Sequence, residues 1–105
     1  MDCQAFFMKV QQGKYQEYKD AHDQLWPEMD RQLLENKIDI AIYYDEPFLF
    51  VYLRAPSAQT WIKHGSSEVT HRWNQYMANL LECNVDGTIK MYPLEEVFTR
   101  GIFQK

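Results

Sequence analysis

The sequence predicts a single α+β domain in which helices cover one face of a four-stranded antiparallel sheet. Its strand-like and helix-like segments follow the order strand, helix, strand, strand, helices, strand. This is the split β-α-β order of ferredoxin-like folds. The predicted strands are also apolar on both faces, which indicates that something covers each side of the sheet. A length of 105 residues fits one domain.

The first strand is expected over residues 5–10, and Gly13 separates it from a long helical pattern over residues 14–36. Apolar and aromatic residues recur there at steps of three and four and form one stripe. Pro27 lies inside this stretch and cannot donate a backbone hydrogen bond. We therefore expect the helix to kink or restart at Pro27.

Two further strands are expected over residues 38–44 and 48–54, joined by the short polar connection 45–47. The short connection indicates an antiparallel hairpin. Both strands lack the alternation with polar residues that a sheet with one wet face would show. The simplest cover is the same face of a second copy. The sequence therefore predicts a homodimer with its sheets face to face, a dimeric α/β barrel.

The rest of the chain predicts two helices and a closing strand. Ser57 is a candidate N-cap for a helix that runs to about His64. The run Gly65-Ser66-Ser67 interrupts the helical pattern, and a second helix starts near Glu68. The last strand is expected over residues 94–98.

Composition excludes several classes of partner. The formal net charge is −4, and basic residues form no stripe, so binding to nucleic acid or to an anionic membrane surface is not expected. No apolar run approaches the ~20 residues that cross a bilayer, and the N-terminus shows no signal-peptide pattern. Cys3 and Cys83 are far apart and form no CxxC motif. We expect a cytoplasmic protein.

His22 is the residue best suited to chemistry. It lies in the apolar stripe of the first helix, with Tyr18 one turn before it and Trp26 one turn after it. Imidazole titrates near neutral pH and can exchange protons in the cell. A Tyr-His-Trp ladder facing a pocket would supply a hydroxyl, a proton-transfer group and a flat ring for a sugar. The alternative is a histidine hydrogen-bonded within the core.

Other titratable residues offer less. His64 and His71 flank the break between the later helices and are interpreted as surface residues, as are Asp20 and Asp23. The histidine spacings match no metal motif. The sequence has neither a GxSxG elbow nor a glycine-rich phosphate loop. No metal and no cofactor are therefore expected.

These residues resemble a known family. The stretch His22-Asp23-Gln24-Leu25-Trp26-Pro27-Glu28, preceded by Tyr18, is similar to the signature of the L-rhamnose mutarotases, and so is Arg72-Trp73 followed by Tyr76-Met77. The resemblance extends over most of the chain. It implies a homodimeric α/β barrel that interconverts sugar anomers without cofactor or metal.

The resemblance also implies roles for single residues. The histidine that matches His22 is the family's proton donor, and the residues that match Tyr18 and Trp73 line the sugar site. Two positions depart from the family pattern, because Ile40 replaces a sugar-contacting tyrosine and Asn74 replaces a second tryptophan. Such changes shift specificity, so L-fucose or another deoxysugar remains an alternative monosaccharide to L-rhamnose. Tyr44, two pleats along from Ile40, is a candidate to compensate.

Two other function classes remain open at this point. Dimeric barrels of this kind also serve as cofactor-free or haem-degrading monooxygenases, an alternative that rests on fold analogy alone. The other alternative is a non-enzymatic sugar-binding or regulatory dimer.

Overall fold

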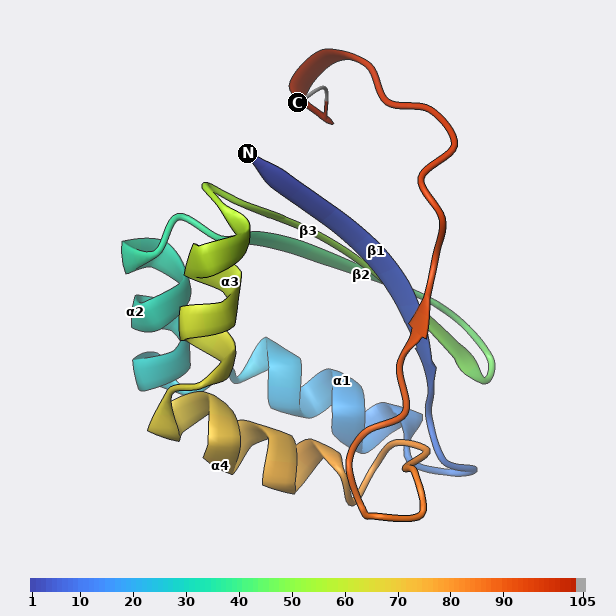
Figure 1. The fold of residues 1–105 in the computed structure, drawn as a ribbon. Coiled ribbons are helices and arrows are strands. Elements are labelled where there is room, and N and C mark those ends of the chain that lie inside the picture. Colours follow the sequence, from blue (N-terminus) through green and yellow to red (C-terminus); the bar gives the residue numbers. More distant parts are fainter. Residues whose placement is uncertain (104–105) are drawn as a thin grey trace.

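The computed structural model describes residues 1–103 and confirms the predicted α+β fold. Four helices lie on one side of a curved sheet (Figure 1). The strands are all antiparallel, in the order β2-β3-β1-β4. The elements are β1 (Asp2–Lys9), α1 (Tyr15–Asp23), α2 (Pro27–Glu35), β2 (Asp39–Asp45), β3 (Phe48–Ala55), α3 (Ala58–Gly65), α4 (Glu68–Met77), β4 (Tyr92–Pro93) and the 3₁₀ turn η1 (Gly101–Phe103).

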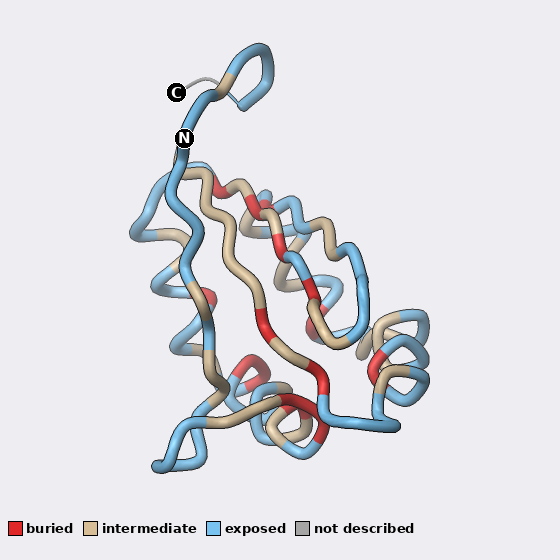
Figure 2. The backbone as a smooth tube through the Cα atoms, turned by 90° about the vertical axis from the view of Figure 1, so that its right-hand side faces the viewer, coloured by how far each residue is buried: buried red, intermediate tan, exposed pale blue. Residues whose placement is uncertain are grey.

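The central strand β3 separates an inner from an outer face of the sheet. Its residues Leu49, Val51, Leu53 and Ala55 are buried on the helix side, and the residues between them point to the opposite side. Buried positions follow the central strands and the inner sides of the helices, whereas the segment after β4 is exposed almost throughout (Figure 2). Helices α1–α4 therefore cover only the inner face. On the outer face, the turn η1 contacts one end, where Phe103 packs edge-on against Tyr52 with centroids 5.0 Å apart.

The helical stretch breaks before Pro27, as predicted. Helix α1 ends at Asp23, and Trp26 has the extended backbone conformation (φ −54°, ψ 131°) that a residue before proline favours. Pro27 then occupies the first turn of α2, where a missing N–H costs nothing. The break turns the chain between α1 and α2, so the two helices occupy different places around the sheet (Figure 1).

The two later helices begin at serine caps. The Ser57 hydroxyl accepts a hydrogen bond from the backbone N–H of Thr60 at 3.1 Å, which confirms the predicted cap of α3. Ser67 does the same for the N–H of Thr70 at 3.2 Å and starts α4. The interruption between these helices is therefore a second helix start, and it lets α4 run across the end of the sheet below α1 (Figure 1).

The closing strand was predicted in the wrong place. The structure has β4 at Tyr92–Pro93, paired with Phe6 and Phe7 of β1, and residues 94–98 have no regular secondary structure. The backbone N–H of Leu94 still bonds to the carbonyl of Ala5 at 2.9 Å, after which the chain leaves the sheet. A strand was expected over residues 94–98, but within residues 1–103 no strand pairs with the segment beyond Leu94.

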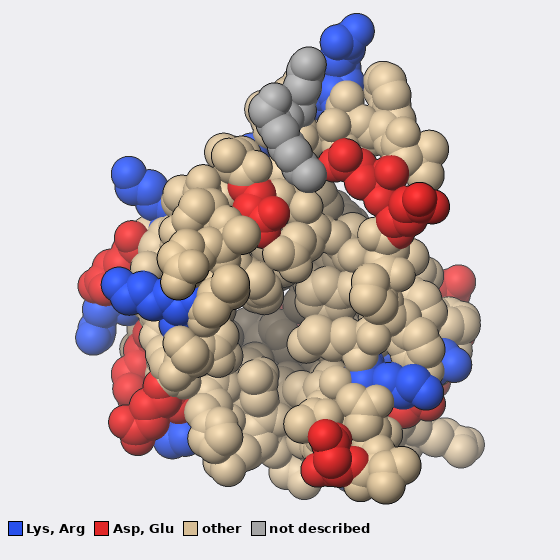
Figure 3. Space-filling view, viewed as in Figure 1, with Lys and Arg blue, Asp and Glu red and all other residues tan. Residues whose placement is uncertain are grey.

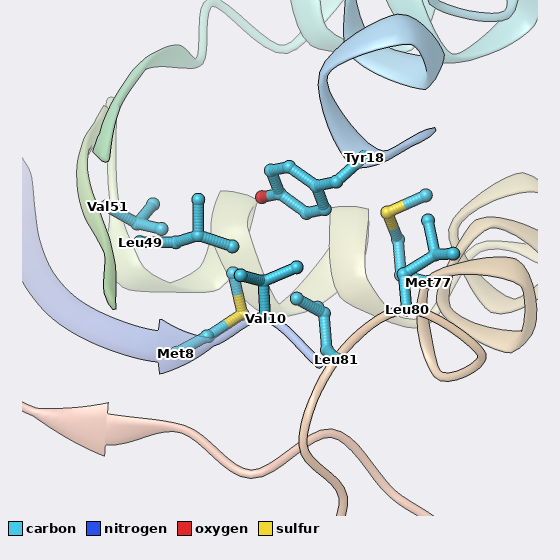
Figure 4. Packing of buried hydrophobic residues seen from close by; sticks show 8 residues of the cluster. All are labelled: Met8, Val10, Tyr18, Leu49, Val51, Met77, Leu80 and Leu81. Atoms are coloured by element: carbon cyan, nitrogen blue, oxygen red, sulfur yellow. The ribbon is translucent and has the colours of Figure 1, made fainter. Parts of the chain in front are cut away.

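The core joins α1, the sheet and the segment after α4. Tyr18 lies over the side chains of Val10 and Leu49 (Figure 4), and it is only 4% exposed. Leu80 and Leu81, just after α4, are each 1% exposed and close the other side. Because Tyr18 is fixed on several sides, it anchors α1 against the sheet. Within residues 1–103, no helix is long and apolar enough to span a membrane.

Candidate active site

A cavity of about 1010 Å³ lies between the sheet and the helices, at the upper end of the ~300–1,000 Å³ typical of small-molecule pockets. Its mouth is the hollow at the centre of Figure 3, where the wall is uncharged and the Lys, Arg, Asp and Glu side chains lie toward the periphery. The sheet supplies an apolar wall from its inner face: Phe6, Met8, Ile40, Ile42, Leu49 and Val51. The polar groups of the cavity come mainly from the helices.

Tyr18 and His22 lie one turn apart on α1 and both line this cavity, as the sequence predicted. Their rings are 4.3 Å apart between centroids. The Tyr18 hydroxyl makes no hydrogen bond within the described residues. Its oxygen is nevertheless not fully buried. It is therefore open to the cavity. Burial raises the pKa of Tyr18 well above its ordinary value, so the hydroxyl stays protonated and can donate.

His22 is held by the backbone of its own helix. Its Nδ1 lies 2.8 Å from the carbonyl oxygen of Tyr18. A carbonyl can only accept, so Nδ1 carries the proton and Nε2 has the free lone pair in the neutral ring. Desolvation lowers the pKa of His22, while the bond to the Tyr18 carbonyl opposes that shift. Nε2 is thus the atom that gains and loses a proton.

Trp73 and Asn74, neighbours on α4, also line the cavity. Trp73 meets the His22 ring edge-on, with centroids 5.2 Å apart. It therefore fixes the plane of the imidazole and also forms part of the cavity wall. Asn74 is exposed at the cavity rim. Helix α4 thus brings Trp73 against His22 and places Asn74 in the lining of the same cavity.

Ile40 lies in the apolar wall, on the same face of β2 as Ile42 and Tyr44. The Tyr44 ring stacks on Tyr15 with centroids 3.6 Å apart. Tyr44 lines the cavity too, but this stacking holds it at the α1 end of the strand. An apolar surface therefore stands where the family pattern has a tyrosine.

Trp26 is displaced from the expected ladder. It follows the end of α1, and it is not among the residues that line the cavity. Its ring instead packs edge-on against Trp73 at 5.1 Å and parallel to Tyr76 at 6.3 Å. The i+4 spacing from His22 fails because the helix has ended before Trp26. Trp26 therefore packs against Trp73 without lining the cavity itself.

His64 was predicted to lie at the surface, and this was wrong. It is 5% exposed and lines the cavity from the last turn of α3. Its polar neighbours in sequence suggested solvent, but its bonding partners come from elsewhere. The Gln32 amide nitrogen, on α2, lies 2.7 Å from Nδ1 of His64. No local signal marks such a contact. His71, in contrast, is exposed as predicted.

Two charged residues of α1, Lys19 and Asp23, line the cavity, and both are exposed. Asp20 and Asp23 are exposed, as predicted, and Asp23 pairs with Lys19 at 2.8 Å. In residues 1–103, no three His, Cys, Asp or Glu side chains are grouped in a way that could hold a metal ion. Besides this ion pair, the polar groups that line the cavity include hydroxyls, amides and imidazoles, which suit an uncharged polyol.

Comparison with known proteins decides the family. The family model described as L-rhamnose mutarotase matches residues 4–100 of the chain. This chain belongs to the L-rhamnose mutarotase family. Among curated members of the family, it is 39% identical to the L-rhamnose mutarotase of Bacillus subtilis, over 93% of this chain and 97% of that protein. It is 37% identical to the L-rhamnose mutarotase of Flavobacterium johnsoniae, over 90% of this chain and 91% of that protein.

A solved structure gives the same family. The crystal structure of an L-rhamnose mutarotase from Formosa agariphila superimposes with a TM-score of 0.80 at 33% sequence identity. The match covers 96% of this chain and all of that chain. The resemblance seen in the sequence motifs is therefore confirmed along the whole fold of this family member.

Proposed function

We propose that the protein interconverts the α and β anomers of L-rhamnose or a closely related deoxysugar. The observation that carries this proposal is the meeting of Tyr18, His22 and Trp73 in one cavity of a chain that belongs to the L-rhamnose mutarotase family. A hydroxyl, a proton-transfer nitrogen and a flat ring are the groups that opening a sugar hemiacetal needs.

The proposed reaction opens and recloses the sugar ring. The reaction begins when His22 has taken up a second proton and both ring nitrogens are protonated. Nε2 then gives its proton to the ring oxygen as the bond between that oxygen and the anomeric carbon breaks, and a base removes the proton of the anomeric hydroxyl. Rotation about the bond beside the new carbonyl exposes its other face. On reclosure, the attacking hydroxyl returns its proton to Nε2 and the base gives its proton to the former carbonyl oxygen, which becomes the anomeric hydroxyl of the other anomer. Such acid–base assistance is worth about 10²–10⁴ in rate.

The base is assigned to no single residue. The raised pKa of Tyr18 argues against a tyrosinate and favours Tyr18 as a hydrogen-bond donor to the sugar. A water molecule, or a residue of a second subunit, fits the role of base better. No metal or cofactor has a part in this proposal.

The choice of sugar rests on the departures from the family pattern. Ile40 offers an alkyl surface in place of a hydroxyl, and Asn74 offers an amide in place of a ring. An alkyl wall suits the methyl group of a 6-deoxysugar, whereas the amide can pair with a hydroxyl. L-Rhamnose and L-fucose both carry this methyl group, and membership of the L-rhamnose mutarotase family leads us to propose L-rhamnose first and L-fucose second.

We also propose that the protein works as a homodimer joined by the outer face of the sheet. Phe7 stacks on Tyr92 at 4.4 Å and meets Phe48 and Phe50 at 5.6 and 6.1 Å, so this face carries an aromatic cluster. Phe50 is 40% exposed although it lies on the central hairpin. An exposed aromatic surface without a covering helix supports pairing with a second copy.

We also propose a cytoplasmic location. The two free thiols, Cys3 and Cys83, are in keeping with it.

The test is NMR exchange spectroscopy between the two anomeric protons of L-rhamnose, with and without protein. The expected result is faster exchange at catalytic protein concentrations. Repeating the measurement with L-fucose and D-glucose ranks the substrates. Exchange that stays at the buffer rate for every sugar would overturn the proposal.

A further inference from the structure

The cavity contains a second buried histidine that the proposed reaction does not use. His64 projects from the last turn of α3, and its ring stacks on Trp61 with centroids 5.3 Å apart and planes 24° apart. Both rings line the same cavity as His22. A buried polar group in a cavity wall needs a hydrogen-bond partner, and the partners of His64 define what it can do.

The side-chain amide of Gln32 fixes which nitrogen of His64 carries the proton. Its nitrogen lies 2.7 Å from Nδ1 of His64, 3.3 Å from the backbone carbonyl oxygen of His64 and 3.1 Å from the Thr70 hydroxyl. A carbonyl oxygen only accepts, so the NH₂ end of the amide must face this group. Nδ1 of His64 therefore accepts a hydrogen bond from Gln32. The neutral ring must then carry its proton on Nε2.

Nε2 of His64 is left for a ligand. It makes no hydrogen bond within residues 1–103. The Nε2 atom is not fully buried, so it keeps some accessible surface. Since the residue is almost fully buried and lines the cavity, the remaining access to Nε2 is from the cavity.

We propose that His64 is a specificity-determining residue whose Nε2–H donates a hydrogen bond to a sugar hydroxyl other than the anomeric one. This inference rests on the proposed mutarotase function. It gives the two histidines opposite polarities. His22 presents a lone pair at Nε2 because its Nδ1 donates to a carbonyl, whereas His64 presents an N–H at Nε2 because its Nδ1 accepts from an amide. In this proposal, His22 exchanges protons with the sugar and His64 holds the sugar in place.

The surroundings of His64 keep it in this form. Burial lowers the pKa of His64, and a second proton on Nδ1 would face the NH₂ group of Gln32. The Thr70 hydroxyl also accepts from Ser67 at 3.0 Å, which ties the network to the start of α4. The donor is therefore fixed before a sugar arrives, and such preorganisation reduces the free-energy cost of binding.

The first test reads the tautomer in the wild-type protein. Long-range ¹H–¹⁵N NMR of the histidine rings distinguishes a protonated Nε2 from a protonated Nδ1, and assignment uses a His64→Phe spectrum. We expect the proton on Nε2 of His64 and on Nδ1 of His22. Titration with L-rhamnose should shift the His64 Nε2–H resonance. A proton on Nδ1 of His64, or a resonance that saturating L-rhamnose leaves unmoved, would overturn the inference.

The second test removes the donor without leaving an orphaned amide. In the double variant Gln32→Met/His64→Phe, both partners of the buried bond become apolar, a change that proteins tolerate better than the loss of one partner. We expect the half-saturation concentration for L-rhamnose to rise about 3- to 10-fold, the size of one neutral hydrogen bond. The matched control is His71→Phe, which removes the exposed histidine of the neighbouring helix and should leave the half-saturation concentration unchanged.

Deoxygenated sugars identify the hydroxyl and separate the two proposals. Loss of the paired hydroxyl, tested with L-rhamnose analogues deoxygenated at C2, C3 or C4, should weaken the wild type but not the double variant. If wild-type protein accelerates L-rhamnose exchange while no analogue distinguishes it from the double variant, the role of His64 is refuted and the mutarotase proposal stands. If wild-type protein accelerates no exchange, the mutarotase proposal fails, and the NMR titration still decides whether His64 contacts a sugar.

Discussion

The imidazole Nδ1 of His22 lies 2.8 Å from the carbonyl oxygen of Tyr18, one helical turn earlier on α1. The bond uses a carbonyl that pairs within the helix and adds a second hydrogen bond to it. It leaves Nε2 as the only ring atom able to exchange a proton with a substrate. The position of the catalytic atom is therefore set by helix geometry, with Trp73 holding the ring from the side.

Replacement of His22 by glutamine should remove proton transfer while keeping a polar side chain of similar length. We expect turnover in the anomer-exchange assay to fall by about 10²–10⁴-fold, the usual contribution of general acid–base catalysis. The thermal midpoint should change little, because His22 is only partly buried. His71→Gln is the control and should retain wild-type turnover. A folded His22→Gln variant with normal turnover would rule out the acid role.

Trp73 and Trp26 are packed against each other but differ in their access to the cavity. We expect Trp73→Phe to raise the half-saturation concentration for L-rhamnose about 2- to 10-fold, the range that about 0.5–1.5 kcal/mol of aromatic contact represents. Trp26→Phe should leave it unchanged, since Trp26 does not line the cavity. Equal effects of the two substitutions would show that Trp73 acts only as packing.

The outer face of the sheet should hold two copies together. Phe50→Asp places a carboxylate in the aromatic cluster beside Phe7, where pairing would bury it without a partner, so we expect a dimer to become a monomer. Sedimentation velocity at micromolar concentration measures this mass. Leu34→Asp is the control, because Leu34 is 71% exposed on α2, away from this face. A wild-type protein that sediments as a monomer would contradict the proposal directly.

Local rules were sufficient for the parts of the fold that depend on neighbours in sequence. The restricted φ of Pro27 and the Ser57 cap predicted where α2 and α3 begin, and the interruption Gly65-Ser66-Ser67 predicted the start of α4 near Glu68. The four-residue spacing of Tyr18 and His22 predicted that they share a face, because both lie within one uninterrupted helix. The same rule failed for Trp26, since it was extended across the helix end.

Long-range partners account for what sequence reasoning missed. His64 is buried by a contact with Gln32, 32 residues earlier, which no spacing rule connects to it. The closing strand is at Tyr92–Pro93 because β1 offers a free edge there. Residues 94–98 were expected to be this strand, but in the described part of the chain no strand pairs with them. The sequence pattern of a segment shows that it can form a strand, and a neighbouring strand with a free edge determines whether it does.

Acid should weaken the fold through the two cavity histidines. Desolvation is the main cause of the lowered pKa of both His22 and His64. Below the ordinary value of about 6.5, the unfolded chain therefore takes up protons that the folded chain does not. The free energy of unfolding should fall as the pH drops from about 7 to 5, and this loss ends only below the folded pKa values. Urea denaturation at several pH values measures it.

The pH range and a variant identify the histidines as the cause. Asp86, whose pKa is lowered by its hydrogen bonds to Thr88, affects stability only near and below the ordinary carboxyl range, so measurements above pH 5 exclude it. In Gln32→Met/His64→Phe, one of the two groups is gone, so the slope of unfolding free energy against pH should become shallower. A stability that is flat or rises on acidification in the wild type would mean that these rings take up protons at least as readily in the folded cavity as in the unfolded chain. The lowered pKa values of His22 and His64 in the folded protein would then be wrong.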